Sequence, residues 1–245
     1  MIKKISVLFA LLCLWEFAAR VSGVPIYILP PPFLILKSLW NNQTLLAKHA
    51  LISSFEILVG LLVSVFLGLL SALLLDHFVR LNLILRPVLL TLQSVPSFVL
   101  MPLLLLWCGF GLIPKLIVIC LSCYFPITIC LLDGLKRSPS SFGDMATVMG
   151  AKPKQVLWRI RLPSSLPFLM SGIRLAAIHA PLTVLAADWL GASSGLGYLV
   201  MLSHGRLQID LMFACVVCIT AMTFALNKGV NMLEKKLVFW PSASH

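Results

Sequence analysis

Six apolar stretches, each long enough to cross a lipid bilayer as a helix, constrain this chain more than any other feature. A bilayer core about 30 Å thick needs about 20 helical residues per crossing. Lipid admits only helices or closed barrels, and the strict two-residue alternation of barrel strands is absent from this sequence. We therefore predict an all-α polytopic membrane protein with about six transmembrane helices. The predicted spans are 5–22, 50–75, 83–107, 112–132, 167–190 and 210–227.

The composition supports this interpretation and excludes soluble enzymes, disordered chains and disulfide scaffolds. Of the 245 residues, 60% are apolar and 11% are charged, whereas soluble domains have about 45–50% and about 25%. The polar segments between spans are short, and the longest on the predicted inner side is 133–166. No such segment is long enough to build a core of its own. We expect one transmembrane domain over 1–245, without a cofactor or metal.

The basic residues predict the orientation of the spans. With a cytoplasmic N-terminus, thirteen Lys and Arg fall in inner segments and five fall in outer segments, Lys115 among the outer five. Cytoplasmic loops carry the excess of Lys and Arg in membrane proteins. Both termini are therefore expected in the cytoplasm, and the net charge of +11 needs no nucleic acid as a partner.

The first span has two interpretations. Lys3 and Lys4 before an apolar core are typical of a cleaved signal peptide. Trp15 and Phe17 extend the apolar run, however, and no A-x-A-like cleavage site follows. An anchor that stays in the membrane is the preferred interpretation.

Polar residues inside the third span leave two alternatives open. Gln93 and Ser97 lie beside Pro96, and Pro102 follows. Proline inside a span frees backbone carbonyls, which neighbouring helices or water satisfy. The segment is either a bent helix whose Gln93 and Ser97 line a polar path, or a kinked helix that only packs.

Acidic residues within the predicted spans are candidates for function, because charge in a membrane is costly. Asp188 is a candidate for the translocation path. Anchoring at the lipid headgroups is the simpler interpretation for Glu16, Glu56 and Asp188. Small residues at four-residue spacing in the second span, Gly60, Ser64, Gly68 and Ala72, predict close helix packing.

The inner segment 133–166 is expected to form a helix–glycine–helix elbow. Ser138-Pro139 is typical of a helix start, and Gly150 is placed to end that helix. Pro153 then opens a second short helix, and Pro163 closes it. Apolar side chains at 145, 148 and 149 form a ridge, and Lys154, Arg159 and Arg161 form a basic rim. The elbow either packs under its own bundle or docks a soluble partner.

This segment resembles the EAA signature of ABC-importer permeases, which is E-A-A, three residues, Gly, nine residues, then I-x-L-P. The matching positions are Asp144, Ala146, Gly150, Ile160, Leu162 and Pro163. Departures are Asp144 for Glu and Met145 for Ala. The resemblance implies that the elbow holds the coupling helix, which docks on an ATP-binding subunit.

Other segments extend the resemblance over most of the chain. Leu29–Pro32, Met101–Trp107 and Gly172–Arg174 are similar to permeases of the nitrate/sulfonate/taurine type. Within that group, 188–198 and 208–210 most resemble permeases assigned to hydroxymethylpyrimidine, a thiamine precursor.

The resemblance implies a permease subunit in the bacterial inner membrane, working by alternating access. Its expected partners are a second copy of itself, two copies of an ABC ATPase subunit, a periplasmic solute-binding protein and the lipid bilayer. The chain contains no P-loop, so ATP hydrolysis is expected on the partner. The expected solute is the thiamine-precursor pyrimidine, with taurine, alkanesulfonate or nitrate as the alternative.

Two other classes of protein fit the sequence less well. A self-contained secondary transporter is expected to show inverted halves and ionisable groups at the membrane midplane, and neither is clear here. A membrane enzyme needs clustered acids or histidines at one face. The eight acidic residues are scattered singly, so the chain is not expected to be an enzyme.

Overall fold

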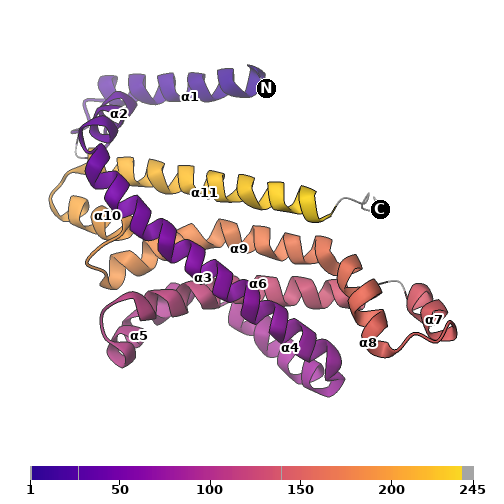
Figure 1. Ribbon diagram of the computed structural model, residues 1–245. Coiled ribbons are helices and arrows are strands. Elements are labelled where there is room, and N and C mark those ends of the chain that lie inside the picture. The colour runs from indigo at the N-terminus through magenta and orange to yellow at the C-terminus, as the bar shows by residue number, and fades with distance from the viewer. Residues whose placement is uncertain (1, 27, 139, 239–245) are drawn as a thin grey trace. The chain divides into compact units, whose positions relative to one another are not determined.

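The computed structural model describes residues 2–26, 28–138 and 140–238, and all regular structure within them is helical (Figure 1). This confirms the predicted all-α class. The elements are α1 (Ile2–Val21), α2 (Pro32–Asn41), α3 (Gln43–His77), α4 (Val79–Gln93), the 3-10 turn η1 (Ser97–Leu100), α5 (Met101–Cys108), α6 (Leu112–Lys136), α7 (Ser140–Val148), α8 (Pro153–Val156), the π turn η2 (Leu157–Arg161), α9 (Leu162–Gly191), α10 (Leu196–Gly205) and α11 (Ile209–Leu237).

Four helical runs in the described residues are long and apolar enough to cross a membrane. They are α3, α6, the run Pro153–Gly191 and α11. A fifth candidate is the pair of helices on either side of residues 94–96. The predicted first span forms the continuous helix α1, but its sequence carries Lys3, Lys4, Glu16 and Arg20. The helix is therefore confirmed, and its crossing of the membrane stays a prediction.

The third predicted span is not one helix. The α4 helix ends at Gln93, and the chain bends by 87° before η1 and α5. Proline has a fixed φ and no N–H, and it disfavours helical geometry in the residue before it. Pro96 therefore prevents α4 from continuing through Val95. The expectation of a bend at this point is confirmed, but continuity over 83–107 was wrong.

Pro163 does not close the second helix of the elbow, so that prediction was wrong. The chain passes from α8 through η2 directly into α9, with Pro163 at the second position of α9. Proline is tolerated in the first turn of a helix, and its missing N–H is accommodated where a wide π turn has already interrupted the α-helical hydrogen bonding.

The chain divides into two compact units, 1–55 with 185–222 and 56–184 with 223–245. In the first unit, α10 supplies Leu196, Leu199 and Val200 to a buried apolar cluster. Ile35 of α2 and Leu46 of α3 complete this cluster, together with α11 side chains between 211 and 219. The core of this unit is thus built around a helix of only ten residues.

In the second unit, α3 packs tightly on α6 through its small residues. A Cβ at Gly60 would collide with the Ile119 side chain, and a Cβ at Gly68 would lie 2.8 Å from Ile127 Cγ2. The Ser64 hydroxyl donates to the carbonyls of Gly60 and Cys120, at 2.5 and 3.3 Å. The small-residue face predicted from the sequence is therefore a packing face between two helices of this unit.

Candidate functional site

The elbow predicted between the fourth and fifth spans is present, and Gly150 forms its turn. Gly150 has φ of +85°, a conformation that favours glycine. Its N–H donates to Thr147 O at 2.9 Å, and the Ala151 N–H donates to Ala146 O at 2.9 Å. These bonds satisfy carbonyls at the end of α7, as in other glycine-terminated helices. Ser138 lies before α7, and Pro139 lies outside the described residues.

The turn brings the predicted coupling residues into one short structure. Asp144 and Ala146 lie on α7, Ile160 lies in η2, and Leu162 and Pro163 begin α9. The α7 helix contacts α8 and η2. All six signature positions therefore belong to a single elbow, which extends from the end of α6 to the start of α9.

The elbow carries an exposed apolar ridge, which we define as Phe142, Met145, Val148 and Met149. Val148 is 89% exposed and Met149 is 82% exposed. Phe142 and Met145 are also exposed. Soluble surfaces rarely leave large apolar side chains clustered in water, and such patches mark interaction sites. The α7 helix is not part of any candidate span among the described residues, and its ridge is a candidate interaction surface.

The predicted basic rim is only partly correct. Lys154 and Arg159 are exposed. Arg161 instead turns toward the second unit's own helices, where it forms an ion pair with Asp76 of α3 at 2.7 Å. Its guanidinium is therefore committed inside the protein and does not belong to the rim.

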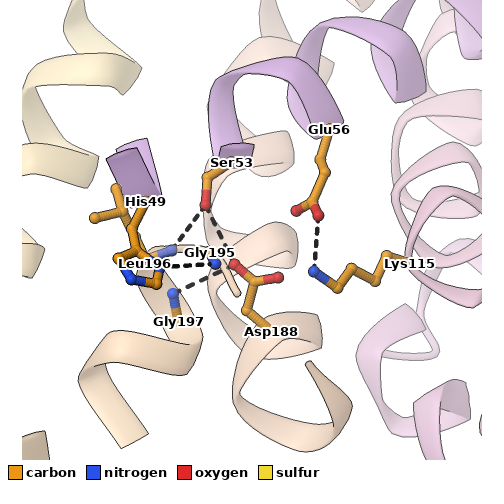
Figure 2. A network of polar contacts seen from close by, with 8 residues as sticks. All are labelled: His49, Ser53, Glu56, Lys115, Asp188, Gly195, Leu196 and Gly197. Atoms are coloured by element: carbon orange, nitrogen blue, oxygen red, sulfur yellow. Dashed lines mark hydrogen bonds and ion pairs between the residues drawn. The ribbon is translucent and has the colours of Figure 1, made fainter. Parts of the chain in front are cut away.

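Asp188, predicted as a path residue, stabilises the start of α10 in the first unit (Figure 2). Its carboxylate accepts from the Gly197 N–H at 3.3 Å and from the Ser53 hydroxyl at 3.2 Å. Ser53 Oγ also accepts from the Leu196 N–H at 2.9 Å, and His49 Nδ1 accepts from the Gly195 N–H at 3.1 Å. Side chains of α3 and α9 thus satisfy three backbone donors that a helix start leaves free.

Headgroup anchoring is wrong for Glu56 and Asp188, because both are buried. Asp188 is fully buried. Glu56 of α3 forms an ion pair at 2.7 Å with Lys115 of α6 in the second unit (Figure 2), and both side chains are about 95% buried. Lys115 is therefore paired inside the protein, and its place on the outer side of the membrane stays a prediction. The sequence shows Glu56 and Lys115 as opposite charges within apolar stretches. No local pattern indicates that these two residues contact each other.

Glu16 also acts on a helix start. Its carboxylate accepts from the Phe33 N–H at 2.9 Å and from Arg20 Nε at 2.6 Å. Phe33 lies in the first turn of α2, where backbone donors have no partner within the helix. The short helix α2 is thus held to α1 by a carboxylate at its positive end.

Gln93 and Ser97 stand on either side of the break between α4 and η1. Gln93 is exposed and Ser97 is half-buried. Both lie in the second unit, whereas Asp188 lies in the first unit. The structure therefore brings Gln93 and Ser97 to one bend in the chain, and their role in a path stays a prediction.

Ser53→Ala is expected to destabilise the protein by about 1–2 kcal/mol, the usual cost of losing a helix-capping side chain. The change removes the acceptor for the Leu196 N–H and the donor to Asp188. Thermal melting of the purified protein measures the effect. Ser171→Ala is the control, because that exposed hydroxyl bonds only its own helix, at Pro167 O. An equal effect of the two substitutions would contradict the capping role.

Known proteins match this chain over nearly its whole length. The family described as binding-protein-dependent transport system inner membrane component matches residues 64–238. A probable ABC transporter permease protein of Haemophilus influenzae is 34% identical, over 98% of each chain. The formylaminopyrimidine transport permease protein ThiX of Halalkalibacterium halodurans is 30% identical, over 94% of this chain and 92% of that protein.

A solved structure shows the same fold. A chain of the inward-facing MetNI methionine ABC transporter superposes with a TM-score of 0.68 at 17% identity. The match covers 80% of the present chain and 97% of the MetNI chain.

Proposed function

This chain belongs to the family of binding-protein-dependent transport system inner membrane components, and from that premise we propose how it moves solute across the membrane. It is the permease subunit of an ABC importer. Two copies form a path between them, and a periplasmic binding protein delivers the solute. Two copies of a separate ATPase subunit dock on the two elbows. ATP binding closes the ATPases, the elbows move as levers, and the spans alternate between inward-open and outward-open states.

The exposed ridge on the elbow is the observation that carries this mechanism. Three large exposed apolar side chains lie on α7, and a fourth, Met149, lies in the turn that follows it, all outside the candidate spans. Burying a large apolar side chain contributes about 1.5–3 kcal/mol, so a partner that covers the ridge gains substantial binding energy. The positive-φ turn at Gly150 fixes the direction in which α7 leaves the elbow. A docking helix held in a fixed direction allows a separate ATPase subunit to move the membrane domain.

The same arrangement sets the proposed orientation. An ATPase subunit works in the cytoplasm, so the elbow lies on that side. The excess of basic residues in the segments that share this side agrees with the placement. Both chain termini then lie in the cytoplasm of a bacterial cell.

The proposed solute is a small pyrimidine of the thiamine-precursor type. The sequence from Asp188 to Tyr198 resembles permeases assigned to hydroxymethylpyrimidine, and the relative named for formylaminopyrimidine transport is 30% identical. A relative named for aliphatic sulfonate transport is also 30% identical, and one named for taurine transport is 28% identical, so taurine and alkanesulfonate, with nitrate from the sequence resemblance, stay as alternatives. These solutes are the alternatives that the experiment has to separate.

Reconstitution of the permease with its ATPase and binding protein in vesicles tests the proposal. ATP supplied on the side of the vesicle membrane that holds the ATPase is expected to drive accumulation of radiolabelled hydroxymethylpyrimidine on that side. Unlabelled taurine and nitrate are expected to reduce this uptake only weakly. ATP-driven accumulation of taurine or nitrate instead would show that the proposed solute is wrong and that the proposed mechanism holds. Uptake driven by an ion gradient, with no ATPase present, would show a secondary transporter.

Gln93→Leu tests the proposed path at the bend between α4 and η1. If Gln93 contacts the solute, losing one hydrogen bond to it is expected to lower uptake about tenfold, while assembly with the ATPase stays intact. Thr91→Val on the same helix is the control, since that hydroxyl bonds its own helix at Pro87 O. Unchanged uptake kinetics in Gln93→Leu would show that this side chain only packs.

A further inference from the structure

One side chain joins the elbow to two membrane helices of the second unit. Arg161 is the last residue of η2. Its Nη1 and Nη2 donate to Asp76 Oδ2 and Oδ1, at 2.9 and 2.7 Å. Nη2 also donates to the Leu135 carbonyl at 3.0 Å. Asp76 lies in the last turn of α3 and Leu135 lies in the last turn of α6. The Arg161 guanidinium and its three hydrogen bonds, which we call the Arg161 fork, therefore connect η2 to the ends of both helices.

The geometry of this contact makes it stiff. A guanidinium that binds a carboxylate through two parallel N–H bonds fixes direction as well as distance, which a lysine ammonium cannot do. The Asp76 side chain is only 10% exposed and that of Arg161 is 33% exposed. Solvent screening is therefore weaker than for an ion pair on an open surface.

The two helices that Arg161 reaches are themselves joined along their length. Glu56 and Lys115 form a buried ion pair between α3 and α6. Farther along, Gly60 and Gly68 lie against Ile119 and Ile127 with no room for a Cβ. A displacement applied at one end of this α3–α6 pair therefore moves both helices together, because packed interiors resist deformation.

We infer that Arg161, through Asp76 and the Leu135 carbonyl, is the positioning residue that transmits the elbow's movement to the α3–α6 pair. This inference rests on the proposed function and adds the link within the permease. Arg161 stands in the variable position of the I-x-L-P segment, and Asp76 lies outside the signature. Docking and transport then depend on different residues. The ridge binds the ATPase subunit, and the Arg161 fork transmits the movement of the elbow to the membrane helices.

The test compares uptake with ATP hydrolysis in the reconstituted complex of permease, ATPase and binding protein. Arg161→Lys keeps the positive charge but loses the two parallel hydrogen bonds to Asp76. Asp76→Asn keeps the size of the side chain but loses its negative charge. Both variants are expected to retain stoichiometric ATPase while solute accumulated per ATP hydrolysed falls at least about fivefold. The probe is radiolabelled hydroxymethylpyrimidine, or whichever of taurine, alkanesulfonate and nitrate the wild-type complex accumulates.

Two controls distinguish this result from general damage to the protein. Arg86 and Asp133 form an ion pair at 2.5 Å between α4 and α6 in the same unit, and neither residue lies in α7, α8 or η2. Arg86→Lys and Asp133→Asn are expected to change the ratio of uptake to hydrolysis less than about twofold. The double variant Arg161→Lys/Asp76→Asn should lose no more than the worse single variant, because both changes break one contact.

The outcomes separate this inference from the proposed function. If the wild-type complex takes up no solute with ATP, the proposed function is overturned and this inference falls with it. If the wild-type complex is coupled and the Arg161 and Asp76 variants keep the same ratio, this inference alone is overturned. It is also overturned if the Arg86 and Asp133 controls lose as much, or if the two losses multiply in the double variant.

Discussion

Gly197→Ala is expected to destabilise the protein by about 3 kcal/mol or more, and to reduce the amount of folded permease in the membrane. A Cβ at this position would collide with the Leu185 carbonyl oxygen and would lie 2.6 Å from Asp188 Cβ. A backbone carbonyl cannot move aside as the end of a flexible side chain can. The start of α10 would have to shift away from α9, and the bonds from Gly197 and Leu196 to Asp188 and Ser53 would lengthen or break.

Gly205→Ala is the matched control at the other end of α10. A Cβ there meets nothing within 4 Å, so the substitution is expected to change stability by no more than about 0.5 kcal/mol. Thermal melting and membrane yield of the two variants give the comparison. Similar melting temperatures for Gly197→Ala and the unsubstituted protein would show that α10 does not start against α9 as described.

Gly150→Pro is expected to abolish uptake and docking of the ATPase. Proline holds φ near −65°, whereas Gly150 has φ of +85°. The substitution also removes the N–H that donates to Thr147 O. The turn would open, and the ridge on α7 would no longer be presented in a fixed direction. Uptake in reconstituted vesicles and co-purification of the ATPase measure the two losses.

Two further substitutions at Gly150 test whether the positive φ of the turn is what uptake requires. Asparagine tolerates positive φ, so Gly150→Asn should retain most uptake. Tryptophan does not tolerate the φ of +85°, so Gly150→Trp should abolish uptake as Gly150→Pro does. Normal uptake and normal ATPase binding in Gly150→Pro would contradict the docking role of the elbow.

The features predicted correctly from the sequence are those that local chemistry determines. Apolar length predicts the membrane helices, and glycine followed closely by proline predicts the turn between α7 and α8. Pro96 predicts a bend in the third span, although the size of the bend depends on how the chain is packed on both sides of it. The six signature residues are close in sequence, so the structure brings them together almost by necessity.

The polar contacts inside the helices were not predictable in the same way. Asp188 and Ser53 are separated by 135 positions, and nothing local shows that both meet the start of α10. Lys115 follows a segment with two glycines, and nothing local in the sequence shows that Glu56, 59 positions away, is its partner. Buried polar groups need partners, so unmatched charges in apolar sequence indicate that partners exist, but tertiary packing decides which ones.

Photo-crosslinking from the ridge tests the central claim most directly. A photoreactive residue at Val148 is expected to capture the ATPase subunit in membranes that contain the whole importer. The same probe at Phe66 of α3, which is 66% exposed on a membrane-crossing helix, should capture lipid and no ATPase. Failure of Val148 to reach the ATPase, while the complex still transports with ATP, would contradict the proposal that this elbow is where the motor acts.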